Sequence, residues 1–126
     1  MMPATTQTET TMQYMLLIHS SEAALQSAPQ DTIARMHVAY MAYTEALTQA
    51  GVVVNGNRLR PTSSTTTVRI VDGKTQTLDG PYAETKEQLA GYYLIDVPDL
   101  DAALSWAARC PGASFGAIEV RPIWVM

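Results

Sequence analysis

Residues 14–20 read YMLLIHS, and the fold that we expect for the whole chain follows from this stretch. Its apolar residues succeed one another instead of alternating with polar ones, which is typical of a β-strand that is covered on both faces. Residues 91–97, GYYLIDV, show the same pattern. Two such strands predict a sheet that carries apolar side chains on both of its faces.

The other elements are predicted from local boundary signals. Ser27 and Gln30 have the spacing of a capping box, which predicts a helix from there to about Ala50. Asp72-Gly73 indicates a two-residue hairpin, because both positions of a type I′ turn need a positive φ. Asp99 is expected to cap a second helix, in which Leu100, Ala103, Leu104 and Ala107 face inward. We therefore expect strands at 14–20, 52–59, 65–71, 74–78, 91–97 and 116–123, and helices at 27–50 and 100–109.

Apart from the hairpin inserted at 65–78, this order is βαββαβ, the α+β arrangement of ferredoxin-like folds. Right-handed connections place both helices on one face of a four-stranded antiparallel sheet. Four strands spaced about 4.8 Å apart are roughly 19 Å wide, so two helices about 10 Å across cover one face only. We expect a second copy to cover the other face, which gives a homodimeric α/β barrel with the apolar residues 124–126 against the partner.

The composition limits the compartment and the partners. The 126 residues fit one domain, which we expect over 14–126 after a polar, disordered tail at 1–13. With 8 basic and 12 acidic residues the net charge is −4, which argues against a nucleic acid partner. Neither a signal peptide nor a run of about 20 apolar residues is visible, so we expect no membrane partner. The single Cys110 fits a cytoplasmic protein.

The segment 79–87, DGPYAETKE, holds the strongest candidate for a ligand-binding site. Asp79, Tyr82 and Glu84 place two carboxylates and a hydroxyl on a loop that Pro81 stiffens, and such groups bind polar ligands or transfer protons. In the structural alternative, Asp79 accepts backbone N–H groups in a turn, Pro81 fixes that turn, and Tyr82 fills the core. Both interpretations remain open at this point.

The two histidines are further candidates for ligand contacts. His19 lies in the same layer as Leu17 at the end of its strand, where it could line a cleft and titrate near neutral pH. His37 lies beside the apolar stripe of the first long helix, which includes Ile33 and Tyr40. Packing, with no part in chemistry, is the alternative for each histidine.

Other site chemistry lacks a recognisable pattern. No HxxxH or CxxC spacing is present, so we expect no metal site, and no glycine-rich phosphate loop indicates a cofactor. No GxSxG frames a serine nucleophile. Cys110 follows a helix C-terminus, where the helix dipole disfavours a thiolate. Arg60 and Arg121 could meet an anionic ligand, although a solvated or ion-paired arginine is the common case.

The segment 79–87 resembles the DGPFAETKE signature of the DGPF-type branch of the YCII-related family, with Tyr82 in place of phenylalanine. The resemblance extends from about Tyr14 to Ile123 and includes AGVVV at 50–54, RLRPT at 58–62 and the run from 91 to 112. It implies a dimeric α/β barrel of ferredoxin-like protomers. Members of the branch often resemble accessory proteins of extracytoplasmic-function sigma factors, and the branch has no settled activity.

Simpler members of that family carry a histidine and an aspartate in the first helix as a candidate acid–base pair. The corresponding positions of this chain resemble Tyr40 and Gln49, so the pair is not carried over, and Tyr40 is kept as a candidate ligand contact.

Three functions follow as hypotheses. The first is a small-molecule-binding or regulatory domain with a cleft under the loop 79–87, since loops on rigid scaffolds often carry function. The second is an enzyme that performs acid–base chemistry on a small substrate in the barrel cleft. The third is a protein-interaction partner of an extracytoplasmic-function sigma factor system.

Overall fold

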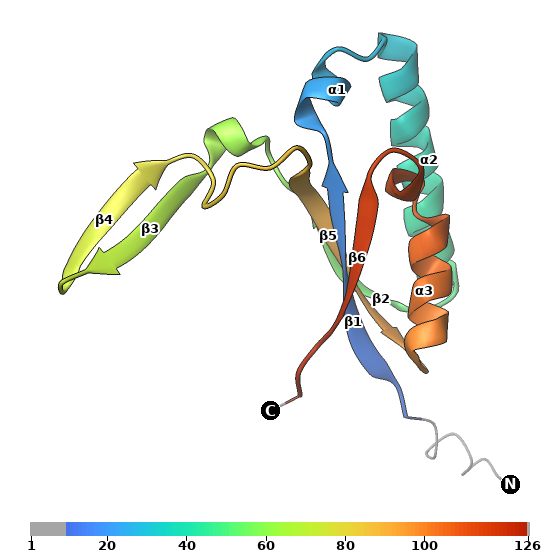
Figure 1. The fold of residues 1–126 in the computed structure, drawn as a ribbon. Helices are drawn as coiled ribbons and strands as arrows, with labels where there is room; N and C mark the ends of the chain where they lie inside the picture. Colours follow the sequence, from blue (N-terminus) through green and yellow to red (C-terminus); the bar gives the residue numbers. More distant parts are fainter. Residues whose placement is uncertain (1–9, 126) are drawn as a thin grey trace, which may run out of the picture.

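The computed structural model describes residues 10–125, and their six strands and three α-helices are labelled in Figure 1. The strands are β1 (Met12–Ser20), β2 (Val53–Arg58), β3 (Thr66–Val71), β4 (Lys74–Asp79), β5 (Gln88–Val97) and β6 (Ala117–Pro122). The helices are α1 (Glu22–Gln26), α2 (Gln30–Gln49) and α3 (Leu100–Arg109), with short 3-10 turns η2 (Thr62–Ser64) and η3 (Pro111–Ser114).

The main sheet has four antiparallel strands in the order β2-β5-β1-β6, with α2 and α3 on one face (Figure 1). This arrangement confirms the α+β prediction and is consistent with a ferredoxin-like fold. Because β2 and β6 are free edges, the described part of the chain forms no closed barrel. The pair β3-β4 forms a separate hairpin that extends away from the sheet on the side opposite the two long helices (Figure 1).

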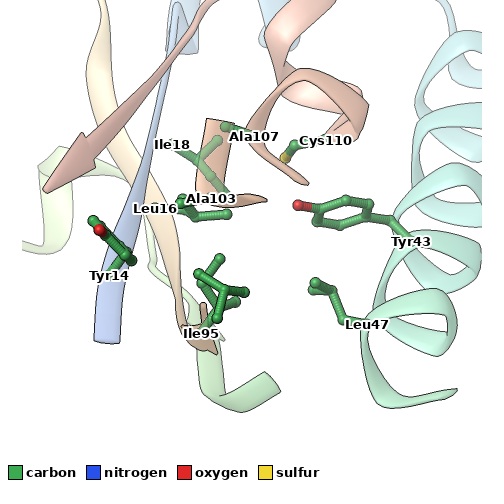
Figure 2. Packing of buried hydrophobic residues seen from close by; sticks show 10 residues of the cluster. Tyr14, Leu16, Ile18, Tyr43, Leu47, Ile95, Ala103, Ala107 and Cys110 are labelled. Atoms are coloured by element: carbon green, nitrogen blue, oxygen red, sulfur yellow. The ribbon is translucent and has the colours of Figure 1, made fainter. Parts of the chain in front are cut away.

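The core lies between the sheet and its two long helices. Leu16 and Ile95 point from β1 and β5 toward Tyr43 and Leu47 of α2 (Figure 2), and three of these four are fully buried. Burying a leucine or isoleucine side chain stabilises the fold by about 1.5–3 kcal/mol. The helix-facing side of the sheet therefore has the cover that the apolar strands require.

The Tyr43 hydroxyl also joins α2 to the end of α3. It donates a hydrogen bond of 2.7 Å to the carbonyl oxygen of Trp106. The last carbonyl groups of a helix lack intrahelical partners, and the Cys110 amide, four residues on, donates to Ala107 instead. Tyr43 thus satisfies a carbonyl that the helix itself leaves without a donor.

The predicted capping box at Ser27 is wrong. The chain forms an extra helix, α1, capped by Ser21, whose hydroxyl accepts a hydrogen bond from the Ala24 amide. Ser27 ends this helix and donates its hydroxyl to two carbonyl groups of α1. Helix α2 then begins after Pro29 without a side-chain cap. A serine that follows a helical turn completes that turn, so it is not available to cap the next helix.

Two other sequence predictions differ from the structure at their margins. Leu100 and Leu104, expected to face inward, are 48% and 46% exposed, whereas Ala103 and Ala107 of the same helix are buried. The expected tail at 1–13 is partly strand, because β1 begins at Met12, while residues 1–9 lie outside the described part of the chain. No helix within 10–125 combines the length and the apolar character that crossing a membrane requires.

The second face of the sheet carries apolar side chains that no helix within residues 10–125 covers. Alternation along β1 directs Met15 and Leu17 to this face, where they are paired with Leu94 and Tyr92 of β5. All four side chains are only half-buried. We refer to Met15, Leu17, Tyr92 and Leu94 as the open-face cluster.

A β-bulge interrupts the pairing of β1 with β5. Ile18 pairs with Gly91 and His19 with Leu89, so Ala90 is an extra residue on β5 without a partner on β1. On its other side, the Ala90 carbonyl accepts a hydrogen bond of 2.8 Å from the Leu59 amide. A bulge bends its strand and changes where nearby side chains point. Here it lies where the ends of β1, β2 and β5 meet.

Candidate functional site

The loop 79–87 starts at the base of the hairpin, where the backbone around Gly80 fixes it. Gly80 has a φ of +112°, a conformation that a residue with a Cβ adopts only under strain. Its amide donates to the Thr65 carbonyl at 2.7 Å, and its carbonyl accepts from the Thr67 hydroxyl at 2.7 Å. The Asp-Gly pair therefore sets how the loop leaves the hairpin.

Four polar side chains from distant parts of the sequence tie this loop to the sheet. The Glu22 carboxylate accepts hydrogen bonds from the amide and hydroxyl of Thr62, at 2.8 and 2.7 Å. The Glu22 amide donates to the side chain of Gln88 at 2.9 Å, and Gln88 in turn donates to the Thr85 carbonyl at 2.6 Å. The Thr85 hydroxyl donates to the Glu87 carbonyl. We call Glu22, Thr62, Thr85 and Gln88 the polar hub.

Two cavities adjoin the polar hub, and each is lined by some of its members. The larger, of about 370 Å³, is lined by residues from β1, α1, the end of β2 and the bulge: Ser20, Glu22, Leu25, Arg58, Leu59, Arg60, Pro61 and Ala90. The smaller, of about 240 Å³, lies under the loop and is lined by Thr62, Pro81, Ala83, Glu84, Thr85 and Gln88. Pockets for small molecules span roughly 300–1,000 Å³, so the larger cavity alone is in that range.

The four candidate residues of the loop 79–87 lie in different surroundings. Pro81 and Glu84 line the smaller cavity, and Asp79 and Tyr82 line neither cavity. Asp79 is the last residue of β4 and pairs with Thr66. The Tyr82 side chain is 75% exposed and lies under the Arg69 guanidinium, 4.8 Å from the ring centre, so it does not fill the core.

His19, His37 and Tyr40 lie in three different environments, and none of them lines either cavity. The His19 Nε2 lies 3.0 Å from the Glu119 Oε1, on the sheet face that also carries Leu17. His37 is exposed on α2. Tyr40 packs against Cys110, and burial, together with the nearby thiol, raises the pKa of the Tyr40 phenol well above its usual value.

The structure therefore forms no acid–base pair among His19, His37 and Tyr40. Burial also raises the pKa of the Cys110 thiol, although its hydrogen bonds with Gly112 and Tyr40 act in the opposite direction, so the thiol stays protonated at neutral pH. Within residues 10–125, no group of three or more His, Cys, Asp or Glu side chains has the arrangement that a metal ion needs.

The residues that shape the larger cavity were not predicted from the sequence, except that Arg60 was considered for an anion. Ser20 and Glu22 lie at a strand end and a helix start, and Arg58 ends β2. The nearest sequence signal is Ser21, whose capping of α1 fixes Glu22 in the first turn. A short helix predicted directly after the buried strand would have indicated the region of the larger cavity.

Comparisons with known proteins agree with the resemblance seen in the sequence. The family model for the YCII-related domain matches residues 12–126. An uncharacterized protein from Rhizobium meliloti (strain 1021) is 38% identical over 114 residues, which cover 89% of this chain and 92% of that relative. The match spans the sheet, both long helices and the loop at the two cavities. This chain belongs to the YCII-related family.

Proposed function

We propose that the chain is a small-molecule-binding domain whose ligand site is formed by the two cavities at the polar hub. The observation that carries this proposal is the larger cavity of about 370 Å³, which adjoins the hub and combines charged with apolar lining residues. The hub links α1, η2 and the loop 79–87 to one point, so a ligand bound beside it would change how the loop is held. Such a change suits a regulatory role, and the loop signature favours the DGPF-type branch.

A thermal-shift screen of the full chain against a metabolite library tests this function. We expect at least one compound to raise the melting temperature, and Ala90→Leu or Ala83→Leu to abolish that shift by filling one of the cavities. Ala39→Leu, an equal change at an exposed position of α2, is the matched control. The proposal is wrong if no compound binds, or if both cavity variants bind the compound as strongly as the wild type does.

We further propose that the protein works as a homodimer whose open faces pack against each other. The open-face cluster is the first support, and the hairpin is the second, because Val68, Ile70 and Leu78 are 58–66% exposed on an isolated pair of strands. Two-stranded hairpins are marginally stable alone. Trp124 and Val125 are also largely exposed beyond β6. A second copy of the chain would cover all three regions.

The dimensions agree with a two-part interface. The sheet face is about 19 Å wide and about 20 Å long, for six residues of roughly 3.3 Å each. A standard interface buries about 800 Å² on each partner, so the sheet face needs the hairpin to reach that area. The facing sheets would give the barrel-like core expected from the sequence. Cys110, buried as a free thiol, suits the cytoplasmic location proposed with it.

Size-exclusion chromatography with light scattering tests the dimer. We expect wild-type protein at micromolar concentration to have twice the mass of the 13.7 kDa chain. Leu94→Glu should give a monomer, because a charge on the open face cannot be buried against its own copy. Val38→Glu, at a 65% exposed position of α2, should remain dimeric. A monomeric wild type, or a dimeric Leu94→Glu variant, would contradict the proposal. Co-purification separately tests association with a transcription regulator.

A further inference from the structure

The lining of the larger cavity is positively charged, whereas the chain as a whole is negatively charged. Arg58 and Arg60 line this cavity, while the whole chain has a net charge of −4. Among residues 10–125, the His19 imidazole contacts the Glu119 carboxylate and Arg35 forms an ion pair with Asp31, whereas neither cavity arginine takes part in an ion pair. Each guanidinium therefore keeps its donors free for a ligand.

Glu22 is the acidic residue of this lining, and its oxygens are already occupied. Both carboxylate oxygens accept hydrogen bonds from Thr62, which turns them toward η2. Its charge still counts in the local field, so two arginines and one glutamate leave the cavity with a net charge of about +1. A ligand with a single negative charge would neutralise it.

Ser20 adds an uncharged polar group to the same wall. It is the last residue of β1, and at 7% exposure it is the buried polar residue of the described chain. No fully buried side-chain oxygen or nitrogen of residues 10–125 lacks a hydrogen-bond partner, so the Ser20 hydroxyl is not an orphaned group. Because Ser20 lines the cavity, its hydroxyl can donate a hydrogen bond to a ligand oxygen there.

The rest of the lining is apolar. Leu25, Leu59, Pro61 and Ala90 contribute hydrocarbon surface from α1, the segment after β2 and the bulge. Apolar walls with a few polar groups at one place are typical of sites that bind the body of a small organic molecule and orient its polar end. The ligand class suggested by this lining is therefore an organic anion and not an inorganic ion.

We propose that this cavity binds a small organic monocarboxylate, with its carboxylate between Arg58 and Arg60 and its apolar part against Leu25 and Pro61. The planar guanidinium group matches a carboxylate with two parallel hydrogen bonds. The Ser20 hydroxyl donates to the same carboxylate. This inference rests on the proposed small-molecule function and names the class of ligand for its larger cavity.

NMR titration of the full chain with benzoate and with hexanoate tests the inference, because chemical shifts detect weak binding and locate it. We expect the amides of Leu59 and Ala90 to shift with either carboxylate, and not with the neutral benzamide or hexanamide. Arg58→Gln or Arg60→Gln should weaken binding by at least about tenfold, since hydrogen bonds to charged groups contribute that much. Arg35→Gln makes the same change of charge on α2 and should alter affinity by less than about twofold.

The outcomes separate this inference from the proposed function. If the carboxylates bind equally well to the Arg58→Gln and Arg60→Gln variants, or no better than their amides, the carboxylate site is wrong. If neither carboxylate binds while another compound does so in a manner that Ala90→Leu abolishes, the carboxylate class is wrong and the small-molecule function stands. If inorganic phosphate binds and the carboxylates do not, the cavity is an anion site of another class and the inference fails. If no compound of any charge binds, both proposals fail.

Discussion

Replacing Glu22 by glutamine should weaken the attachment of the turn η2 to α1. The Glu22 carboxylate accepts two hydrogen bonds from Thr62, at 2.8 Å from the amide and 2.7 Å from the hydroxyl. A glutamine can keep both contacts, because its Oε1 accepts from the Thr62 amide and its NH₂ group donates to the Thr62 hydroxyl. Two hydrogen bonds to a charged acceptor are therefore replaced by two neutral ones, each weaker by about 1 kcal/mol.

The size of the effect follows from these contacts. The two weakened hydrogen bonds together lose about 2 kcal/mol. Because Glu22 is only half-buried, we take a loss of about 1.5–2 kcal/mol. With about 1.4 kcal/mol for each factor of ten, the hydrogen exchange of the Thr62 amide should become roughly 10–30 times faster.

Hydrogen exchange followed by NMR measures this directly, because the Thr62 amide is itself the donor. Glu45→Gln is the matched control, since Glu45 is exposed on α2 and the change of charge is the same. It should leave the exchange of Thr62 unchanged. A Glu22→Gln variant whose Thr62 amide exchanges within about twofold of wild type would refute the reasoning that the carboxylate holds η2 in place.

Two further predictions concern the core. Tyr43→Phe should lower the free energy of unfolding, measured with urea, by about 1–3 kcal/mol, because it leaves the Trp106 carbonyl without its donor. The control is Tyr93→Phe, which removes a hydroxyl that is hydrogen-bonded to Thr44 in a more exposed setting and should lower the free energy of unfolding clearly less at the same protein concentration. Equal losses in the two variants would contradict this prediction. Burial raises the pKa of Cys110 and Tyr40 above the values of the unfolded chain, so the unfolded state loses these protons first as the pH rises. The free energy of unfolding should therefore be constant up to about pH 8 and fall above the ordinary thiol pKa of 9.0. The fall should be up to about 1.4 kcal/mol per pH unit for each of the two groups, Cys110 and Tyr40, once the pH exceeds its unfolded-state pKa. Equal free energies of unfolding in urea at pH 8 and pH 10 would contradict this prediction.

Local signals predicted the parts of the fold that depend on neighbouring residues. Helix α3 begins after Asp99 and ends at Arg109 as expected, with the Asp99 side chain accepting from the Ala102 amide. The hairpin turn at Asp72-Gly73 has a positive φ at both residues. These features depend on four residues or fewer, so one stretch of sequence contains all the information that they need.

The candidate site was less predictable because distant residues build it. Glu22 bonds to Thr62, 40 residues away, while its amide bonds to Gln88, 66 residues away. Such pairs leave no periodic pattern and no motif. The loop 79–87 lies beside the smaller cavity, and of its four candidates only Pro81 and Glu84 line that cavity. Which side chains face a cavity depends on the bulge and on η2, and neither was expected.

The bulge residue Ala90 is not required for the pairing of β1 with β5, but it does help to form the larger cavity. A relative without this one residue could keep Ile18 opposite Gly91 and His19 opposite Leu89, so the pairing of the two central strands would survive the deletion. It would lose the carbonyl that holds the Leu59 amide, and with it the anchor of the segment that carries Arg60. Gain or loss of a single residue at this point would thus reshape the larger cavity while the scaffold stayed the same.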